Sequence, residues 1–456
     1  MTAFLTKTRW RAILFTAFVA LAWLNQSVGG KDWDELRDHT SAAPLLDRLR
    51  YPFMFLYRRS GDEAIYYETA SATLGLPYDT SVFAQRGDSP LPPVATPVDG
   101  RFHVPYAEVP FEYPPPNVPF VVVPRMLVKG FATYAYLFGA VMGLLLVVAT
   151  AMAARLGAAR DDEHDEAKRI AAVGLLLLAH GAIAVQRLDA IVALLVVLMV
   201  RAAIRGDDRS LGFWGGLVGA AKLVPFLLLP VLVITSGLRD ARRLAAVALG
   251  ASLGLALGLG PMIVLGRESL PLLLTYHSAR GLHVESSFGV LYGAAKAVMG
   301  MREASTMDYG SFNFHGPFSR VLAKSALAVT LGLVALVGYA AHRGGRAEPD
   351  PAERHERIVL AALATLTALW LGGKVFSPQY LTWAIPLAVA MPGRRWRHVA
   401  VGLGLVLFLS QLFLRGFYDH VYNQWPAGVV TMLVRLVVLV ALFAVAVREL
   451  SARPAA

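Results

Sequence analysis

Two adjacent acids, Asp62 and Glu63, open the stretch whose residue types best fit chemistry, GDEAIYYETASATLGLPYD at residues 61–79. Apolar and small residues follow at near-helical spacing from Ile65 to Leu74, and Gly75-Leu76-Pro77 ends the pattern. We therefore predict a short helix with an acid in its first turn. A helix N-terminus favours the ionised form of a carboxyl group, which suits an acid that must meet a substrate. The alternative is a capping acid with no chemical role, which this stretch taken alone favours.

Further polar side chains fall at the outer ends of the long apolar segments, where ionisable residues are costly and usually functional. Acids and bases occur together there, and Pro114-Pro115-Pro116 stiffens the approach to the second apolar run. This combination favours a site at the outer membrane surface that handles an anionic substrate. The residues concerned are Glu112 and Tyr113; Arg187 and Asp189; His277, Arg280 and Glu285 within residues 276–286; and Lys374, Ser377, Gln379 and Tyr380.

Each of these groups also has an interpretation without chemistry. Arg187 and Asp189 are equally consistent with a local ion pair at a turn, and His277 with a hydrogen-bonded loop residue. Lys374 fits a lysine that extends its ammonium group to lipid headgroups. Lys222 has apolar neighbours on both sides, and it fits such a role or a helix cap as well as a ligand contact.

The composition indicates a membrane protein. The 456-residue chain is 56% hydrophobic and only 16% charged, against about 25% charged residues in soluble globular proteins. Several apolar runs approach the roughly 20 residues that cross a bilayer, so we expect many spans. The net charge of +11 comes mostly from short basic clusters between these runs. That pattern indicates topology and contact with anionic membrane lipids rather than nucleic-acid binding.

The composition also bears on cofactors. The chain contains no cysteine, which excludes disulfides, thiolate nucleophiles and zinc–sulfur sites. The acids are either adjacent, as Asp62 and Glu63 are, or far apart, so no array of metal-binding carboxylates is visible. We therefore expect no cofactor, and the pattern does not support a divalent metal.

Basic residues set the orientation, because they favour the cytoplasmic side of a membrane. Lys7, Arg9 and Arg11 precede the first apolar run, which we interpret as an uncleaved span; a signal peptide is the alternative. Residues 29–117 and 266–316 then form large extracytoplasmic loops, and both termini are cytoplasmic in a multi-pass protein of the cell membrane. The twelve predicted spans of this single domain (1–456) are residues 12–28, 131–153, 170–185, 191–204, two within 211–234, 244–265, 317–341, 358–373, 381–391, 399–414 and 429–447.

The segment 211–234 has basic clusters on both sides. We interpret it as a hairpin of two short helices that bends near Lys222 and Pro225. A single span is the alternative, and it would invert the topology downstream. The hairpin is preferred because it leaves all later arginine clusters in the cytoplasm.

Six segments, spread over most of the chain, carry a family resemblance in their order and spacing. They are GDEAIYYETASATLGLPY (61–78), FEYPP (111–115), QRLD (186–189), AAKLVPFLLLP (220–230), YHSARGLHVES (276–286) and KVFSPQYLTWAIP (374–386). Together they resemble the family-87 glycosyltransferases of the GT-C superfamily, membrane enzymes similar to bacterial polyprenyl-phosphate-mannose-dependent mannosyltransferases. The fold that this implies is an all-α polytopic membrane protein, a GT-C-like bundle of about 12 transmembrane helices with large extracytoplasmic loops.

The resemblance also implies a reaction. A hexose, mannose in these relatives, passes from a polyprenyl-phosphate donor to a lipid or glycan acceptor, with inversion at the anomeric carbon. Asp62 stands where the family places its catalytic acid, which would be the general base. Glu63 departs from the family pattern, which has an apolar or aromatic residue there, so which acid acts stays open.

The remaining candidates are implied substrate contacts. Arg280, His277 and Lys374 would surround the departing phosphate, and Arg187 is a further cation for it. Tyr113, Tyr380 and Trp383 fit either stacking on a sugar or a place in the interfacial aromatic belt. The other residues predicted to bind substrate are Glu63, Glu112, Asp189, Glu285 and Gln379.

Two other classes of membrane protein compete with this interpretation. A transporter or lipid flippase would call for charges near mid-membrane and related halves, and neither is evident in the sequence. A polymerase or ligase of surface polysaccharide also has many spans and outer loops, but its outer-loop patterns differ. Labelled polyprenyl-phosphate mannose separates a polymerase or ligase from a glycosyltransferase.

Overall fold

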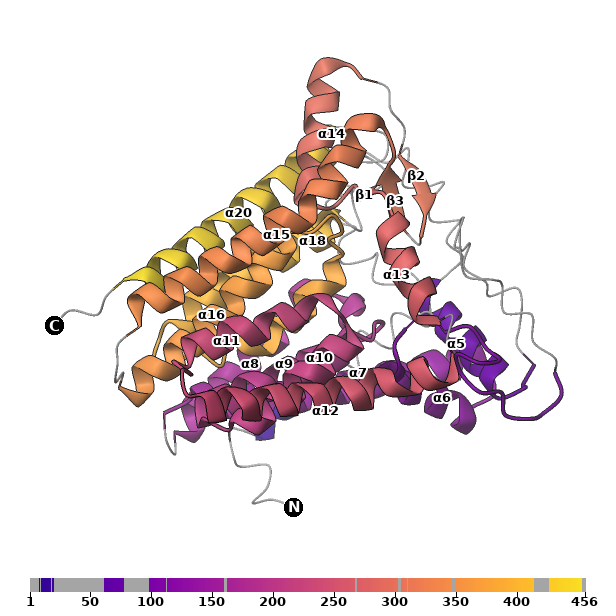
Figure 1. Cartoon of the computed structure of the whole chain (residues 1–456), viewed down its shortest axis with the longest axis horizontal. Coiled ribbons are helices and arrows are strands. Elements are labelled where there is room, and N and C mark those ends of the chain that lie inside the picture. The colour runs from indigo at the N-terminus through magenta and orange to yellow at the C-terminus, as the bar shows by residue number, and fades with distance from the viewer. Residues whose placement is uncertain are drawn as a thin grey trace.

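The computed structural model of this chain describes residues 8, 10–17, 19, 61–77, 98–111, 113–159, 162–266, 269–301, 305–309, 311–345, 350–413 and 426–452. The described part is predominantly helical, as predicted (Figure 1). By length and composition, four of its helices can cross a membrane: α7 (Phe131–Gly157), α12 (Ala241–Leu265), α15 (Pro317–Gly344) and α20 (Pro426–Ser451). These four support a membrane protein, and the total of twelve spans stays a prediction.

The first predicted span is described only in part. Residues 10–17 are helical, and this piece packs on α8 (Glu163–His180). Thr16 Oγ1 donates to the carbonyl of Ile170 at 2.9 Å. The rest of residues 12–28 lies outside the described residues.

The centre of the bundle contains α9 (Asp189–Arg205) and α16 (Pro351–Gly372), whose side chains are buried along most of their length. Around them lie α7, α8 and α18 (Trp396–Leu412). A turn with η5 (Ala182–Ala184) joins α8 to α9. The third and fourth predicted spans are therefore confirmed as helices joined by a turn, and the placement of that turn outside the cytoplasm stays a prediction.

The predicted hairpin is also confirmed. Helix α10 (Asp208–Ala221) ends at Lys222, whose backbone is extended, and η6 (Val224–Leu227) and α11 (Leu228–Thr235) follow. Helices α10 and α12 run parallel, because Gly212 lies against the carbonyl of Val247 and Gly216 against that of Ala251. Since both helices run in one direction, the chain between them must return, which a single span over residues 211–234 would not do.

The predicted span 381–391 is wrong as a regular helix. The structure has η7 (Pro378–Trp383) and α17 (Ile385–Ala388) instead, although all residues from 381 to 391 are buried. Prolines lack the backbone donor that a continuous helix needs, and they restrict the residue before them.

This irregular segment nevertheless returns along α8 as predicted. Thr382 Oγ1 lies 2.9 Å from Nε2 of His180 at the C-terminal end of α8. Near the other end of α8, Arg169 Nη1 donates to the carbonyls of Val389 (2.8 Å) and Met391 (2.6 Å). Side-chain donors therefore form hydrogen bonds with backbone carbonyls that have no partner within a regular helix.

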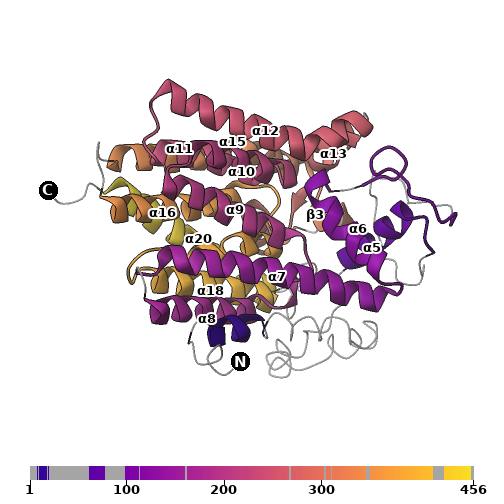
Figure 2. The same cartoon turned by 90° about the horizontal axis from the view of Figure 1, so that it is seen from below.

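The two large loops meet at one end of the bundle. The first contributes α5 (Gly61–Thr73) and η4 (Pro115–Asn117) and leads directly into α6 (Val118–Leu127), and the second contributes α13 (Ser269–Ala279) and α14 (Ser287–Met299). Figures 1 and 2 place α5, α6 and α13 together, at the end opposite the C-terminus. Ser269 Oγ donates to the carbonyl of Tyr106 at 3.1 Å, which joins the loops directly.

The second loop also contains a small antiparallel sheet that the all-α prediction lacked. Its order is β1-β3-β2, with β1 (Leu282–His283), β2 (Thr306–Asp308) and β3 (Ser311–Phe314). Leu282 pairs with Phe314, and Thr306 with Asn313. Strands of two to four residues carry too little alternation to be recognised in a sequence.

Candidate active site

Asp62 lies in the first turn of α5, and its side chain is 27% exposed, whereas most of the helix is buried. Its carboxylate oxygen Oδ2 forms an ion pair with Arg187 Nη1. The hydroxyl of Tyr113 donates to the same oxygen at 3.4 Å, and Tyr66 donates in turn to Tyr113 at 3.3 Å. The carboxylate thus engages two other segments of the chain, which a helix-capping role does not require.

Helix α5 is held firmly in place. It ends as predicted, because Gly75 has φ +60° and a Cβ there would lie 2.6 Å from the carbonyl oxygen of Arg101. Arg125 of α6 donates from Nε to Ser71 Oγ at 2.7 Å and from Nη2 to the carbonyl of Pro77 at 3.0 Å. Packing and charged hydrogen bonds therefore fix the position from which Asp62 projects.

The two adjacent acids differ in accessibility. Glu63 is only 1% exposed, so it faces the interior of the bundle. Successive residues on a helix point about 100° apart, which explains how neighbours reach such different surroundings. Of the two acids, Asp62 is therefore the one that a substrate can approach.

Arg187 projects from an otherwise buried turn. Every residue from 181 to 190 is buried except Arg187. Asp189 has partners on other elements: Lys222 Nζ lies 2.7 Å from its Oδ1, and Trp383 Nε1 donates to the same oxygen at 2.6 Å. The alternative of a purely local Arg187–Asp189 pair is therefore wrong.

Lys222, Asp189, Tyr380 and Trp383 form a second group, next to that of Asp62, Tyr113 and Arg187. The ammonium nitrogen of Lys222 lies 4.3 Å from the ring centroid of Tyr380 and 5.2 Å from that of Trp383, and the two rings stack at 4.8 Å. The alternative of Lys222 extending to lipid headgroups is therefore wrong. Trp383 is 1% exposed and donates inward, so sugar stacking by Trp383 is also wrong.

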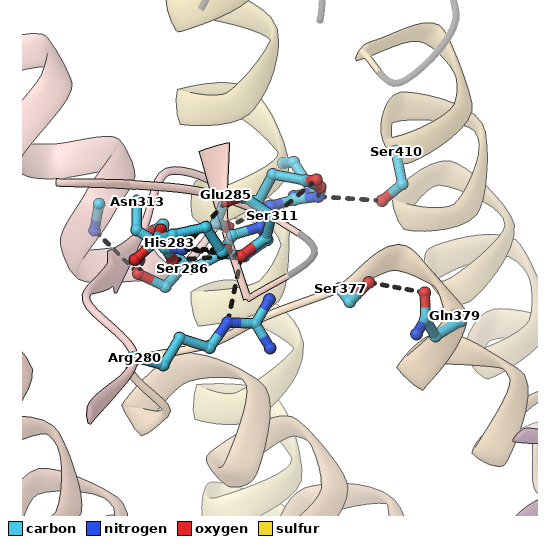
Figure 3. A network of polar contacts seen from close by, with 12 residues as sticks. Arg280, His283, Glu285, Ser286, Ser311, Asn313, Ser377, Gln379 and Ser410 are labelled. Carbon is cyan, nitrogen blue, oxygen red and sulfur yellow. Dashed lines mark hydrogen bonds and ion pairs between the residues drawn. The ribbon is translucent and has the colours of Figure 1, made fainter. Parts of the chain in front are cut away.

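A third group joins the second outer loop to the turn after α16. Lys374 Nζ donates to the carbonyls of Ser278 (2.9 Å) and Arg280 (2.8 Å), so it does not extend to headgroups. Arg280 Nε donates to Ser311 Oγ at 3.1 Å, below the sheet in Figure 3. Burial, together with the charge of Arg280, lowers the pKa of Lys374. Two cations thus lie close together at the loop end of the bundle.

Glu285 lies close enough to Arg280 for their charges to interact, and it is buried, with an exposure of 3%. Arg435 of α20 lies 3.7 Å from its carboxylate and donates to its backbone carbonyl at 2.7 Å. Burial raises the pKa of Glu285 to about 7, which the nearby Arg435 opposes. His283 Nε2 is 3.9 Å from Glu285 Oε1, and burial holds its pKa well below the ordinary value.

Arg435 is a residue that the sequence interpretation missed. The signal was available, because an arginine inside the apolar run 429–447 is unusual in a membrane span. Its guanidinium also covers the Phe376 ring at 4.5 Å. The residue therefore ties α20 to both the second outer loop and the turn that carries Lys374.

The pair of Asp308 and His315 was also missed. His315 Nε2 lies 2.9 Å from Asp308 Oδ2, and Asn313 Nδ2 donates to Asp308 Oδ1 at 2.5 Å. Asp308 ends β2 and His315 directly follows β3, so their proximity depends on a sheet that has no clear signal in the sequence. Ser311 connects this network to Arg280.

Of the remaining predicted site residues, some have a described position and others do not. Gln379 accepts a hydrogen bond from Ser377 Oγ at 2.7 Å on η7, as Figure 3 shows. Glu112 and the side chain of His277 lie outside the described residues. Among the residues described, no three His, Asp or Glu side chains gather as metal ligands do. The expectation of no cofactor stays a prediction.

Short segments of the chain connect the three groups of side chains. Arg187 and Asp189 share a turn, which links the Asp62 group to Lys222 and Trp383. Residues 374–383 then carry both Trp383 and Lys374. A carboxylate with an accessible face and a pair of cations therefore lie at one end of the bundle, an arrangement suited to proton removal and to phosphate binding.

Comparison with known proteins identifies the family of this chain. A search of curated proteins found no counterpart for this chain. The family model of glycosyltransferase family 87 matches residues 111–378, a range that includes Arg187, Lys222 and Lys374 but begins after Asp62. Because this match covers more than half of the 456 residues, the chain belongs to glycosyltransferase family 87.

Proposed function

We propose that this membrane glycosyltransferase moves a hexose, mannose in our assignment, from a polyprenyl-phosphate donor to a hydroxyl of a lipid or glycan acceptor. The observation that supports this most directly is the Asp62 carboxylate, partly exposed and held by Arg187 and Tyr113 at the loop end of the bundle. A lipid-linked donor presents its headgroup at the membrane surface. A fixed carboxylate at the end of a membrane bundle is well placed to meet it.

In this proposal Asp62 is the general base. The acceptor O–H gives its proton to the Asp62 carboxylate while its oxygen forms a bond to the anomeric carbon. The bond from that carbon to the phosphate oxygen breaks, and polyprenyl phosphate leaves with the electron pair. Attack from the face opposite the phosphate inverts the anomeric configuration. Arg187 orients the base, since a guanidinium carries five N–H donors in a rigid fork.

Arg280 and Lys374 are the proposed partners of the leaving phosphate. The phosphate gains negative charge as the bond breaks, and charge-assisted hydrogen bonds stabilise that change. Lys374 donates to two carbonyls and carries a third N–H, and Arg280 uses Nε for Ser311. Both side chains therefore have donors beyond these contacts, which support the loop structure.

The proposed orientation places this chemistry outside the cytoplasm. Arginines gather at the opposite end of the bundle, where Arg243 pairs with Asp208 and Arg395 lies 2.5 Å from Glu356. An excess of basic residues marks the cytoplasmic side. We accordingly assign both termini to the cytoplasm and the site to the outer face of the cell membrane.

The decisive experiment compares Asp62→Asn with the wild type in proteoliposomes supplied with labelled polyprenyl-phosphate mannose and a membrane-lipid acceptor extract. We expect Asp62→Asn to lower turnover by about 10²- to 10⁴-fold, the usual contribution of a general base. Glu108→Gln, an exposed acid of the same loop, is the matched control and should keep wild-type turnover. Wild-type turnover in folded Asp62→Asn would contradict the assignment.

The same assay separates the competing classes. Label that crosses the bilayer without forming a glycosidic bond would identify a transporter or flippase instead. Label that accumulates only in a long polymer would identify a polymerase. An inverted anomeric centre in the isolated product, read by its NMR coupling constant, is the expected result for direct displacement.

A further inference from the structure

Lys222 lies in the short connection between α10 and η6. Helix α10 ends one residue before it, and the extended backbone at Lys222 (φ −157°, ψ 115°) directs the side chain out of the helical path. The side chain is 25% exposed, and its Nζ lies 2.7 Å from Asp189 Oδ1. The proposed reaction gives this lysine no role.

Asp189 is enclosed on the other side of this contact. Its side chain is 4% exposed, and the indole N–H of Trp383 donates to the same oxygen that Lys222 contacts. The ammonium nitrogen also lies 4.3 Å from the centroid of the Tyr380 ring, a cation–π contact. A carboxylate so deeply buried depends on its cation, because an unpaired buried charge is strongly unfavourable.

The chain connects this pair to the proposed base. Asp189 stands two residues after Arg187, and Arg187 contacts Asp62. The other side chains of residues 181–190 are buried, so Arg187 and Asp189 stand in one packed turn. The Asp189 carboxylate is therefore a second acid in the turn that carries Arg187, and Lys222 neutralises it.

We propose that Lys222 is a positioning residue, which occupies Asp189 so that Arg187 stays directed at Asp62. This inference rests on the proposed function of Asp62. Lys222 takes no part in bond making. Without its ammonium group, Asp189 becomes an unpaired buried carboxylate and attracts Arg187, and the Asp62 carboxylate loses its orienting partner.

The test is a rescue experiment in the proteoliposome assay with labelled polyprenyl-phosphate mannose. Lys222→Met should lower kcat by about 10²-fold with little change in donor KM, since misplacement of a reacting group by about 1 Å costs this much. Adding Asp189→Asn to Lys222→Met removes the competing carboxylate. The double variant should recover to within a few-fold of Asp189→Asn alone, and Lys222→Arg should keep most of the activity.

A matched control separates positioning from general stability. Arg243→Met removes another ion pair of α10, with Asp208 at the opposite end of the helix. It should lower thermal stability with unchanged kcat per folded protein. The double variant contains no isolated buried charge, so it tests the proposal even where Lys222→Met alone does not fold.

The outcomes are distinguishable from a failure of the proposed function. If Asp62→Asn is inactive while Lys222→Met is fully active, the positioning role is overturned and the function stands. A double variant with kcat per folded protein far below that of Asp189→Asn also overturns it, because the proposal requires Arg187 to stay directed at Asp62 once the competing carboxylate is removed. Full turnover in Asp62→Asn would instead overturn the function on which the inference rests.

Discussion

Arg187 of the α8–α9 turn forms an ion pair with Asp62 in the first turn of α5, which joins the first outer loop to the centre of the bundle. The arginine is the single residue of the stretch 181–190 that is not fully buried. Its contact brings a carboxylate from a loop helix to a fixed position beside a rigid turn.

Arg187→Met should lower kcat by about 10²-fold, because Asp62 loses the group that orients it. Arg187→Lys should recover part of the loss, since it restores the charge without the planar fork. Initial rates in proteoliposomes measure both. Arg101→Met is the control, an exposed arginine of the loop that carries Asp62, where it pairs with Asp99. Equal kcat in Arg187→Met and Arg101→Met would refute the role of the contact.

Arg280→Met should raise the donor KM by about 10- to 100-fold, the loss expected for a charged hydrogen bond of about 1.5–3 kcal/mol to phosphate. The reason is its place beside Lys374 at the loop end of the bundle. Donor titration at saturating acceptor measures the change. Arg320→Met, which removes an exposed arginine that donates to the His315 carbonyl, should leave donor KM unaltered. A normal donor KM in Arg280→Met would exclude this residue from phosphate binding.

Glu285 should make stability depend on pH. Burial raises its folded-state pKa to about 7 from an ordinary 4.5, so the native state holds a proton that the unfolded chain has released between these values. The stabilisation from this group is complete below about pH 4.5 and is lost as pH rises through about 7. Thermal unfolding of purified protein in detergent should therefore show a decline in Tm from pH 5 to pH 8.

Glu285→Gln tests the origin of that decline. The amide does not titrate, so the fall in Tm from pH 5 to pH 8 should be smaller in this variant than in the wild type. Glu108→Gln changes an exposed acid and should retain the full decline. An equal decline in all three proteins would show that Glu285 is ionised at both pH values.

Glycines at the α10–α12 interface should tolerate no side chain. A Cβ at Gly216 would lie 2.2 Å from the carbonyl oxygen of Ala251, so Gly216→Ala should destabilise the protein by about 1–3 kcal/mol. Gly260→Ala is the control, because nothing lies within 4 Å of a Cβ there. That change should be neutral or stabilise α12 by up to about 1 kcal/mol. Tm values in detergent compare the two, and equal values would argue against the close packing.

Features that depend on local signals could be predicted from the amino-acid sequence. The end of α5 follows from Gly75 and Pro77, and α12 (Ala241–Leu265) closely matches the predicted span 244–265. The break at Lys222 follows from a proline three residues later and from basic clusters on both sides. Apolar runs, glycines, prolines and charge clusters act within a few residues, so their effect can be read without a fold.

The contacts between polar groups, in contrast, depend on how the helices pack. The sequence singled out Asp62, Arg187, Asp189 and Lys222, but it left open a local Arg187–Asp189 pair, whereas packing gave each residue a partner on a distant element. Packing also brings Arg435 to Glu285, and it supports the irregular backbone of residues 381–391. A buried charge takes whichever partner the packed helices bring to it, and that choice depends on contacts between remote segments, which no local pattern records.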